Sequence, residues 1–113
     1  MIGKEALLQK ALLQYIGIQY PGVEVVASMA GERRGWDAQR LAKALGLKKG
    51  VSDLTLYGPD RAVLFLELKK PGEKPTKEQM SFLWRMADRG HSATWCDNID
   101  SAINIVDQWA QKK

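Results

Sequence analysis

Apolar residues in the middle of the chain form two runs of strand length, over 50–56 and 62–69, with a short turn between them. The second run alternates in the manner of a β-strand, so Glu67 and Lys69 share one side. Its first half is apolar on both sides, which indicates a strand in the middle of a sheet. If the two runs pair as a hairpin, Asp53 comes opposite Glu67 or Lys69. The pattern therefore predicts two carboxylates and a lysine at one end of a sheet.

Hydrophobic spacing on either side of this hairpin predicts the rest of the fold. Residues 3–18 carry a broad apolar face at helical spacing, and Pro21-Gly22 follows as a helix breaker. The other elements are predicted in the same way, from periodicity, caps and breakers. They are a strand over 23–29, a short helix over 37–45, a helix over 76–89, a strand over 91–96 and a final helix ending near Trp109. On the helix over 76–89, the residues expected to face the core are Met80, Leu83, Trp84 and Ala87. This order predicts an α/β domain with one mixed sheet flanked by helices.

Composition narrows the class of protein. The chain has 113 residues, which suits a single domain over 1–113 with one modest core. No stretch approaches the roughly 20 apolar residues of a membrane helix, so we expect no membrane partner. The single cysteine, Cys96, excludes an internal disulfide and suits a reducing compartment, so we expect a cytoplasmic protein. A net charge of +4 is compatible with nucleic acid as a partner without requiring it.

The predicted cluster of Asp53, Glu67 and Lys69 is the residue set of a metal-dependent phosphodiesterase. Two carboxylates and a backbone carbonyl can hold Mg²⁺, which binds through one or two carboxylates and retains several waters. A lysine beside them can orient the attacking water or stabilise negative charge on the phosphate. The alternative, from spacing alone, is that Glu67 and Lys69 form a solvated pair at a strand end while Asp53 closes a turn.

Four short motifs, in chain order, resemble those of the virus-type replication-repair nuclease (VRR-NUC) family, a branch of the PD-(D/E)xK superfamily. The family's G-x-x-D motif matches residues 50–53, and its E-x-K motif matches residues 67–69. Its downstream glutamine matches Gln79, and its acidic residue on the opening helix matches Glu5. Position 52 is Ser52 where the superfamily's name has proline, a departure that the VRR-NUC branch tolerates. The resemblance spans nearly the whole chain.

The resemblance implies the αβββαβ core of that superfamily and the activity of a divalent-metal-dependent DNA endonuclease. It implies that Asp53, Glu67 and the Leu68 carbonyl bind Mg²⁺ or Mn²⁺. It also implies that Lys69 positions the attacking water.

Two further residues of the implied site have competing local explanations. By resemblance, Glu5 supports the metal directly or through a water, but the helix dipole also favours an acid near a helix N-terminus. By resemblance, Gln79 is an active-site glutamine. The segment from Thr76 to Gln79 also fits a capping box, with Thr76 as N-cap and Gln79 as N3. Both explanations stay open for each residue.

Basic residues gather around the predicted site and are candidates for contacts with DNA. Arg33 and Arg34 lie between two glycines beside Trp36, as in a loop that grips a phosphate backbone. Positive charge before and after the cluster would draw a polyanion towards it. This charge comes from Arg40, Lys43, Lys48, Lys49 and Lys70. The alternative is that all of these are solvated surface charges.

The resemblance also bears on substrate and assembly. VRR-NUC domains that stand alone resemble junction-resolving nucleases of phages and bacteria, so we expect branched DNA such as a four-way (Holliday) junction. One site cuts one strand at a time, and symmetric cleavage is most simply achieved by a homodimer. The alternatives are a DNA-binding module without turnover, a monomeric nickase of flaps or single strands, and a structural α/β domain. The candidate interface residues are Trp36, Trp95, Ile99, Ile103 and Trp109.

Overall fold

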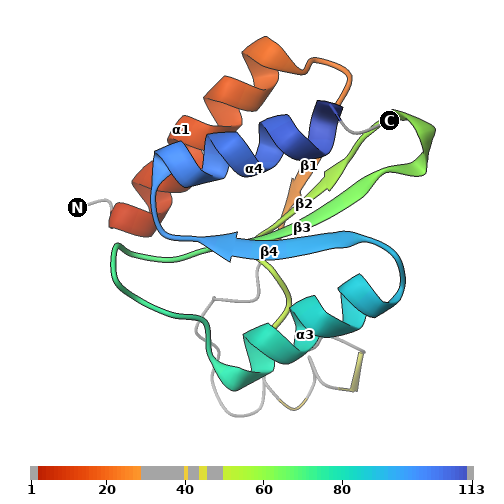
Figure 1. The fold of residues 1–113 in the computed structure, drawn as a ribbon. Coiled ribbons are helices and arrows are strands. Elements are labelled where there is room, and N and C mark those ends of the chain that lie inside the picture. Colours follow the sequence, from red (N-terminus) through yellow and green to blue (C-terminus); the bar gives the residue numbers. More distant parts are fainter. Residues whose placement is uncertain (1–2, 29–39, 41–43, 46–49, 112–113) are drawn as a thin grey trace.

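The structure is a computed structural model that describes residues 3–28, 40, 44–45 and 50–111. Its elements, labelled as in Figure 1, are α1 (Lys4–Gln19), β1 (Glu24–Ala27), β2 (Leu54–Tyr57), η1 (Pro59–Arg61), β3 (Val63–Leu68), α3 (Lys77–Asp88), β4 (Ser92–Cys96) and α4 (Ile99–Gln111). The four strands form one sheet in the order β1-β2-β3-β4. Strands β1 to β3 are antiparallel and β4 runs parallel to β3, so the sheet is mixed.

This architecture confirms the fold class predicted from the sequence, an αβββαβ core with a mixed sheet flanked by helices. Strand β3 lies between β2 and β4, as its apolar residues on both sides predict. The strand predicted over 23–29 is shorter in the structure and covers Glu24–Ala27. The helix predicted over 37–45 lies outside the described residues, apart from 40, 44 and 45. None of the described helices is long and apolar enough to span a membrane.

One side of the β2–β3 hairpin forms the core with α1 and α4. Helix α1 buries a narrow stripe at four-residue spacing, so Leu7 and Leu13 on its predicted apolar face are exposed. The sequence allowed Trp109 to lie either in an interface or in the core, and the structure places it in this core. The core side chains include Leu12 and Ile16 of α1, Leu54 and Leu56 of β2, Leu64, Leu66 and Leu68 of β3, and Ala102 and Val106 of α4.

Helix α3 covers the opposite face of the sheet from α1 and α4 (Figure 1). Phe65 alternates with the core leucines of β3 and meets Phe82 of α3 edge-on, with ring centroids 5.5 Å apart. Leu83 is the buried residue of this helix. The sequence predicts that Trp84 and Ala87 also face the core, and this is wrong because both are exposed. Trp84 is turned about 100° from Leu83 around the helix axis, which carries it off the packed stripe.

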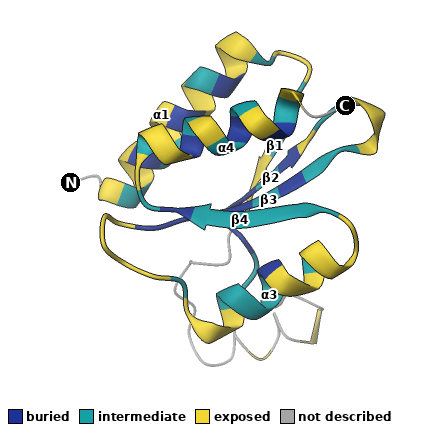
Figure 2. Cartoon of the chain, viewed as in Figure 1, coloured by how far each residue is buried: buried dark blue, intermediate teal, exposed yellow. Residues whose placement is uncertain are grey.

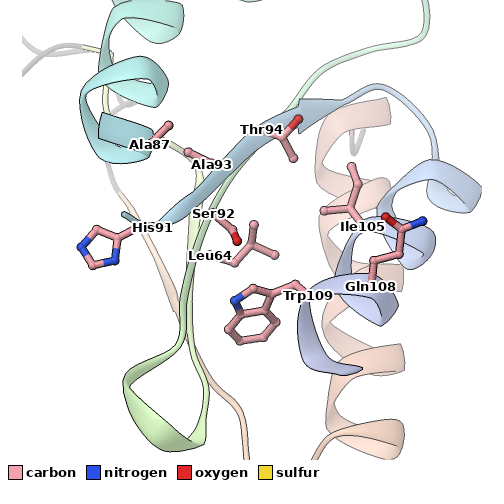
Figure 3. A pocket seen from close by; sticks show the side chains of 9 residues that line it. All are labelled: Leu64, Ala87, His91, Ser92, Ala93, Thr94, Ile105, Gln108 and Trp109. Carbon is pink, nitrogen blue, oxygen red and sulfur yellow. The ribbon is translucent and has the colours of Figure 1, made fainter. Parts of the chain in front are cut away.

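A hollow of about 520 Å³ lies beside the edge strand β4, between α3 and α4 (Figure 3). Leu64 and Trp109 form part of its wall, and His91 lies at its rim. The hollow follows the beginning of β4, whereas the predicted carboxylates lie where β3 ends. It therefore contributes nothing to the predicted chemistry.

Candidate active site

The register between β2 and β3 brings Asp53 and Glu67 together. Leu54 pairs with Leu66 across the antiparallel ladder, so the next residues along, Asp53 and Glu67, are opposite one another on one face. Glu67 Oε1 accepts a hydrogen bond from the Asp53 main-chain N–H at 3.0 Å. In return, Asp53 Oδ2 accepts one from the Leu68 N–H at 2.8 Å. Of the two partners that the sequence left open, Glu67 is the one opposite Asp53.

Main-chain hydrogen bonds hold both strand ends in place. The Asp53 carbonyl accepts from the Ser28 N–H at 2.8 Å, which continues the pairing with β1. The Lys69 N–H donates to the carbonyl at the end of β4 at 2.9 Å. Ser52 is buried, and its Oγ donates to the Leu54 carbonyl at 3.2 Å. Ser52 thus donates a local hydrogen bond from its side chain. A proline at this position, as in the PD-(D/E)xK motif, could not do so, because proline has no side-chain donor.

Glu67 is a buried carboxyl group, only 2% exposed. Burial is the main cause that raises its pKa from 4.5 to about 8, and the negative charge of Asp53 adds to the shift. Lys69 opposes it, with its Nζ 3.8 Å from Glu67 Oε2. A buried carboxylate is costly unless it is paired or bound to a metal. The pair of carboxyl groups therefore favours an added cation or a proton.

Lys69 is buried as well, with 8% of its surface exposed. Its ammonium is paired with two carboxylates, because Nζ lies 3.8 Å from Glu67 Oε2 and 3.4 Å from Glu73 Oε1. Sequence reasoning missed Glu73, because a spacing of four residues brings side chains together on a helix, and residues 69–73 contain a turn. The contacts hold the lysine beside the acidic pair instead of letting it extend into solvent.

The residue set fits a hard divalent cation. Asp53 engages the main chain through Oδ2 and Glu67 through Oε1. Their second oxygens, Asp53 Oδ1 and the Glu67 Oε2 that lies 3.8 Å from Lys69 Nζ, are the ones that a cation can use. Oxygen donors of this kind suit Mg²⁺ and Mn²⁺. Across residues 3–28, 40, 44–45 and 50–111, no three His, Cys, Asp or Glu side chains are grouped to hold a metal ion. A cation here would take two carboxylates, with main-chain carbonyl, water and phosphate oxygens completing its shell.

Gly50 brings the first turn of α3 against the segment that carries Asp53. Its φ is +80°, and a Cβ at this position would lie 2.6 Å from the Glu78 carbonyl oxygen, so the close approach requires glycine. Gln79 is the residue after Glu78 in the first turn of α3. Its Oε1 accepts from the Thr76 N–H at 2.8 Å, and Thr76 Oγ1 accepts from the Gln79 N–H at 3.2 Å, which confirms the predicted capping box. A catalytic role for Gln79 stays a prediction.

The other predicted site residues are placed less closely. Glu5 is partly buried in the first turn of α1, and this helix begins at the end of the sheet where β4 ends (Figure 1). Its role at a metal stays a prediction. Lys70 and Arg40 are exposed. The remaining candidates for DNA contacts lie outside the described residues, and they are Arg33, Arg34, Lys43, Lys48 and Lys49.

Fold and site together define an α/β domain with an Asp…Glu-x-Lys cluster at one end of a mixed sheet. More narrowly, its fold is that of VRR-NUC domains. A solved structure described as a VRR_NUC domain has 19% identity and a TM-score of 0.68, covering 94% of this chain and 97% of its own. Another, described as a VRR_NUC domain protein, has 20% identity and a TM-score of 0.71, covering 96% of this chain and 89% of its own. No protein-family model and no curated protein matches the sequence.

Proposed function

We propose that this protein is a divalent-metal-dependent endonuclease that hydrolyses phosphodiester bonds in DNA. The observation that carries the proposal is the reciprocal hydrogen bonding of Asp53 and Glu67, with the Lys69 ammonium 3.8 Å from Glu67. The fold shared with two VRR_NUC domain proteins adds support. A solvated pair at a strand end, the alternative from the sequence, does not account for the burial of Glu67 and Lys69.

In this proposal, Asp53, Glu67 and the Leu68 carbonyl hold Mg²⁺ or Mn²⁺. The ion supplies Lewis acidity and neutralises charge at the scissile phosphate. Lys69 orients the attacking water or stabilises the negative charge that develops on the phosphate. Glu73 shares the lysine with Glu67 and so holds its ammonium at the acidic pair. Glu5 and Gln79 support the site from α1 and from the first turn of α3.

The proposed substrate is branched DNA, with a four-way junction as the preferred form and a homodimer as the active species. Lys70 and Arg40, both exposed, and the predicted basic residues over 33–34, 43 and 48–49 would contact the phosphate backbone. Such contacts carry no sequence information, so selectivity in this proposal comes from the shape of the DNA.

The proposal is tested by incubating the protein with linear, flapped and four-way DNAs, with and without Mn²⁺. We expect cleavage only with the metal, and a loss of about 10²–10³ in rate in Lys69→Met. Methionine is the appropriate replacement because the lysine is buried, and the shorter alanine would leave a gap. Lys10→Ala, on the exposed surface of α1, is the matched control for loss of a positive charge.

Two results would count against the proposal. Full cleavage by a correctly folded Lys69→Met variant would remove the assigned mechanism. Salt-sensitive DNA binding by the wild type, without cleavage under any metal, would favour a DNA-binding module without turnover.

A further inference from the structure

Trp84 stands out on the surface of α3 because 64% of it is exposed. The helix packs through Leu83, and the neighbouring tryptophan is turned away from the sheet. The outer side of α3 is largely exposed in Figure 2. A large aromatic ring presented to solvent on a helix next to an active site is a candidate for contact with a ligand that has a flat face.

Arg85, the next residue, is held in place beside it. Its Nη1 donates to Ser81 Oγ at 2.7 Å, and its guanidinium carbon lies 5.9 Å from the centre of the Phe82 ring. Phe82 in turn packs edge-on against Phe65. The guanidinium is therefore oriented at the surface instead of sampling many rotamers, which lowers the entropy cost of binding an anion.

The same contacts connect this part of α3 to the active site. Phe65 lies two residues before Glu67 on one face of β3, and Phe82 and Arg85 follow outward from it. Two residues along a strand span about 7 Å. The Phe65 and Phe82 ring centres are 5.5 Å apart, and the Arg85 guanidinium carbon is 5.9 Å from the Phe82 ring. Arg85 is therefore within a distance on the order of 20 Å from Glu67. About six nucleotides, at about 3.4 Å per stacked step, cover that distance.

The two chain segments that carry α3 and α4, on opposite faces of the sheet, differ in charge. The segment over 92–111, which forms β4 and α4, contains three aspartates and neither lysine nor arginine. The segment over 70–89, which leads from the active site along α3, contains three acids, and one of these, Glu73, is paired with Lys69. A polyanion is therefore attracted to the α3 side. The exposed cations of that segment are Lys70, Lys74, Lys77, Arg85 and Arg89.

We propose that an unpaired nucleotide of the substrate stacks on Trp84, with its phosphate bound by Arg85. An exposed indole accepts any base, and the base must be unpaired because a base inside a duplex has both faces covered by its neighbours. The inference rests on the proposed function, since it takes DNA as the ligand, and it adds a reason for selecting branched DNA. A flap contains unpaired nucleotides, and a four-way junction offers them where base pairs at the branch point open, whereas a continuous linear duplex offers none.

The test measures binding without turnover. Fluorescence anisotropy in EDTA would follow a labelled oligothymidine and a labelled blunt-ended linear duplex of two separate strands, with equal numbers of phosphates. Trp84→Ala should weaken binding of the oligothymidine by about 5- to 100-fold, the loss expected for one stacked base, and change duplex binding less than about twofold. Trp84→Phe should restore most of the affinity. Tyr57→Ala, which removes another exposed aromatic side chain at the end of β2 remote from Asp53, should have no effect.

Several outcomes would overturn this inference. They are unchanged oligothymidine binding in Trp84→Ala, equal losses on both DNAs, and failure of the wild type to bind the single strand. A change in molecular mass in Trp84→Ala, with DNA affinity unchanged, would mean that the ring contacts a protein surface such as a second copy of the chain. Because binding is measured without metal, a failure of cleavage leaves this inference standing. Normal cleavage with unchanged binding in Trp84→Ala defeats it and leaves the nuclease proposal intact.

Discussion

At the scale of residues, the candidate active site is a set of charged groups that the fold has largely removed from water. Glu67 and Lys69 are both buried. Glu67 also accepts a hydrogen bond from the Asp53 main chain, and Lys69 also pairs with Glu73. The effective dielectric constant is lower than in water, so the repulsion between the two carboxyl groups is stronger and a divalent cation is correspondingly more stabilising. Burial, and after it the repulsion from Asp53, raise the pKa of Glu67 to about 8.

The pH dependence of stability should reveal the buried carboxyl group. Because the pKa of Glu67 in the folded protein is about 8, above its ordinary 4.5, the folded state binds the proton more tightly than the unfolded state. The resulting stabilisation is complete below pH 4.5 and is lost as the pH rises through about 8. Without metal, Glu67→Gln should therefore be more stable than the wild type at alkaline pH, since each pKa unit corresponds to about 1.4 kcal/mol.

Urea unfolding in EDTA at several pH values between about 5 and 9 measures this effect. The free energy of unfolding of the wild type should fall relative to that of Glu67→Gln across the range. A difference between the two proteins that stays constant with pH would contradict the assignment of the raised pKa to Glu67.

Removal of either carboxylate should weaken metal binding. Asp53→Asn and Glu67→Gln preserve shape and remove charge, so we expect Mn²⁺ affinity to fall by about tenfold or more in each. Isothermal titration calorimetry makes the measurement, and Asp60→Asn, an exposed acid in the hairpin turn, is the control. Unchanged affinity in both variants would mean that these residues are not the ligands.

At the scale of elements, the position of α3 depends on a glycine. Gly50 allows the main chain of Glu78 to approach the segment before Asp53, and Gly72 provides a comparison because its φ is +84° with open space around it. Gly72→Ala should therefore cost only the backbone strain, about 1–2 kcal/mol. Gly50→Ala should cost more and should also reduce cleavage, because the first turn of α3 must move. Equal losses of stability in the two variants, measured by urea unfolding, would contradict the packing role of Gly50.

The capping box at the start of α3 separates the two roles of Gln79. Thr76→Ala and Gln79→Ala each remove one bond of the cap, and each should cost about 1 kcal/mol of stability. If Gln79 also acts in the active site, only its variant should lose cleavage rate beyond the loss of folded protein. Matching activities in the two variants, assayed at a temperature where both are folded, would assign Gln79 to the cap alone.

At the scale of the whole molecule, the proposed homodimer is the expectation that concerns assembly. Static light scattering at micromolar concentration should give about twice the chain mass of 12.7 kDa, and four-way junctions should be cleaved faster than linear duplex. Trp95, Ile99 and Ile103 are partly buried and remain candidates for the interface. A monomer that cleaves linear and branched DNA at equal rates would exclude the dimer while leaving the nuclease proposal in place.

The sequence alone determined the order of the described elements and which charged residues gather at the ends of β2 and β3. Alternation along residues 62–69 predicts which side of β3 is apolar, and the hairpin turn then limits the partner of Asp53 to two residues. The capping box and the ends of α3 are likewise predicted, because caps are local interactions. These features depend on residues close together in the chain, so periodicity and spacing are sufficient to find them.

The tertiary structure decided how far each side chain is covered and which distant groups meet. Periodicity placed Trp84 in the core, but the packed stripe of α3 is narrow, and only the docking of the helix on the sheet shows that the ring is exposed. Likewise, the exchange of hydrogen bonds between Asp53 and Glu67, the burial of Lys69, and the contact of Gly50 with Glu78 depend on strand register and helix position. Burial is a property of all neighbouring elements at once, and a one-dimensional pattern does not contain it.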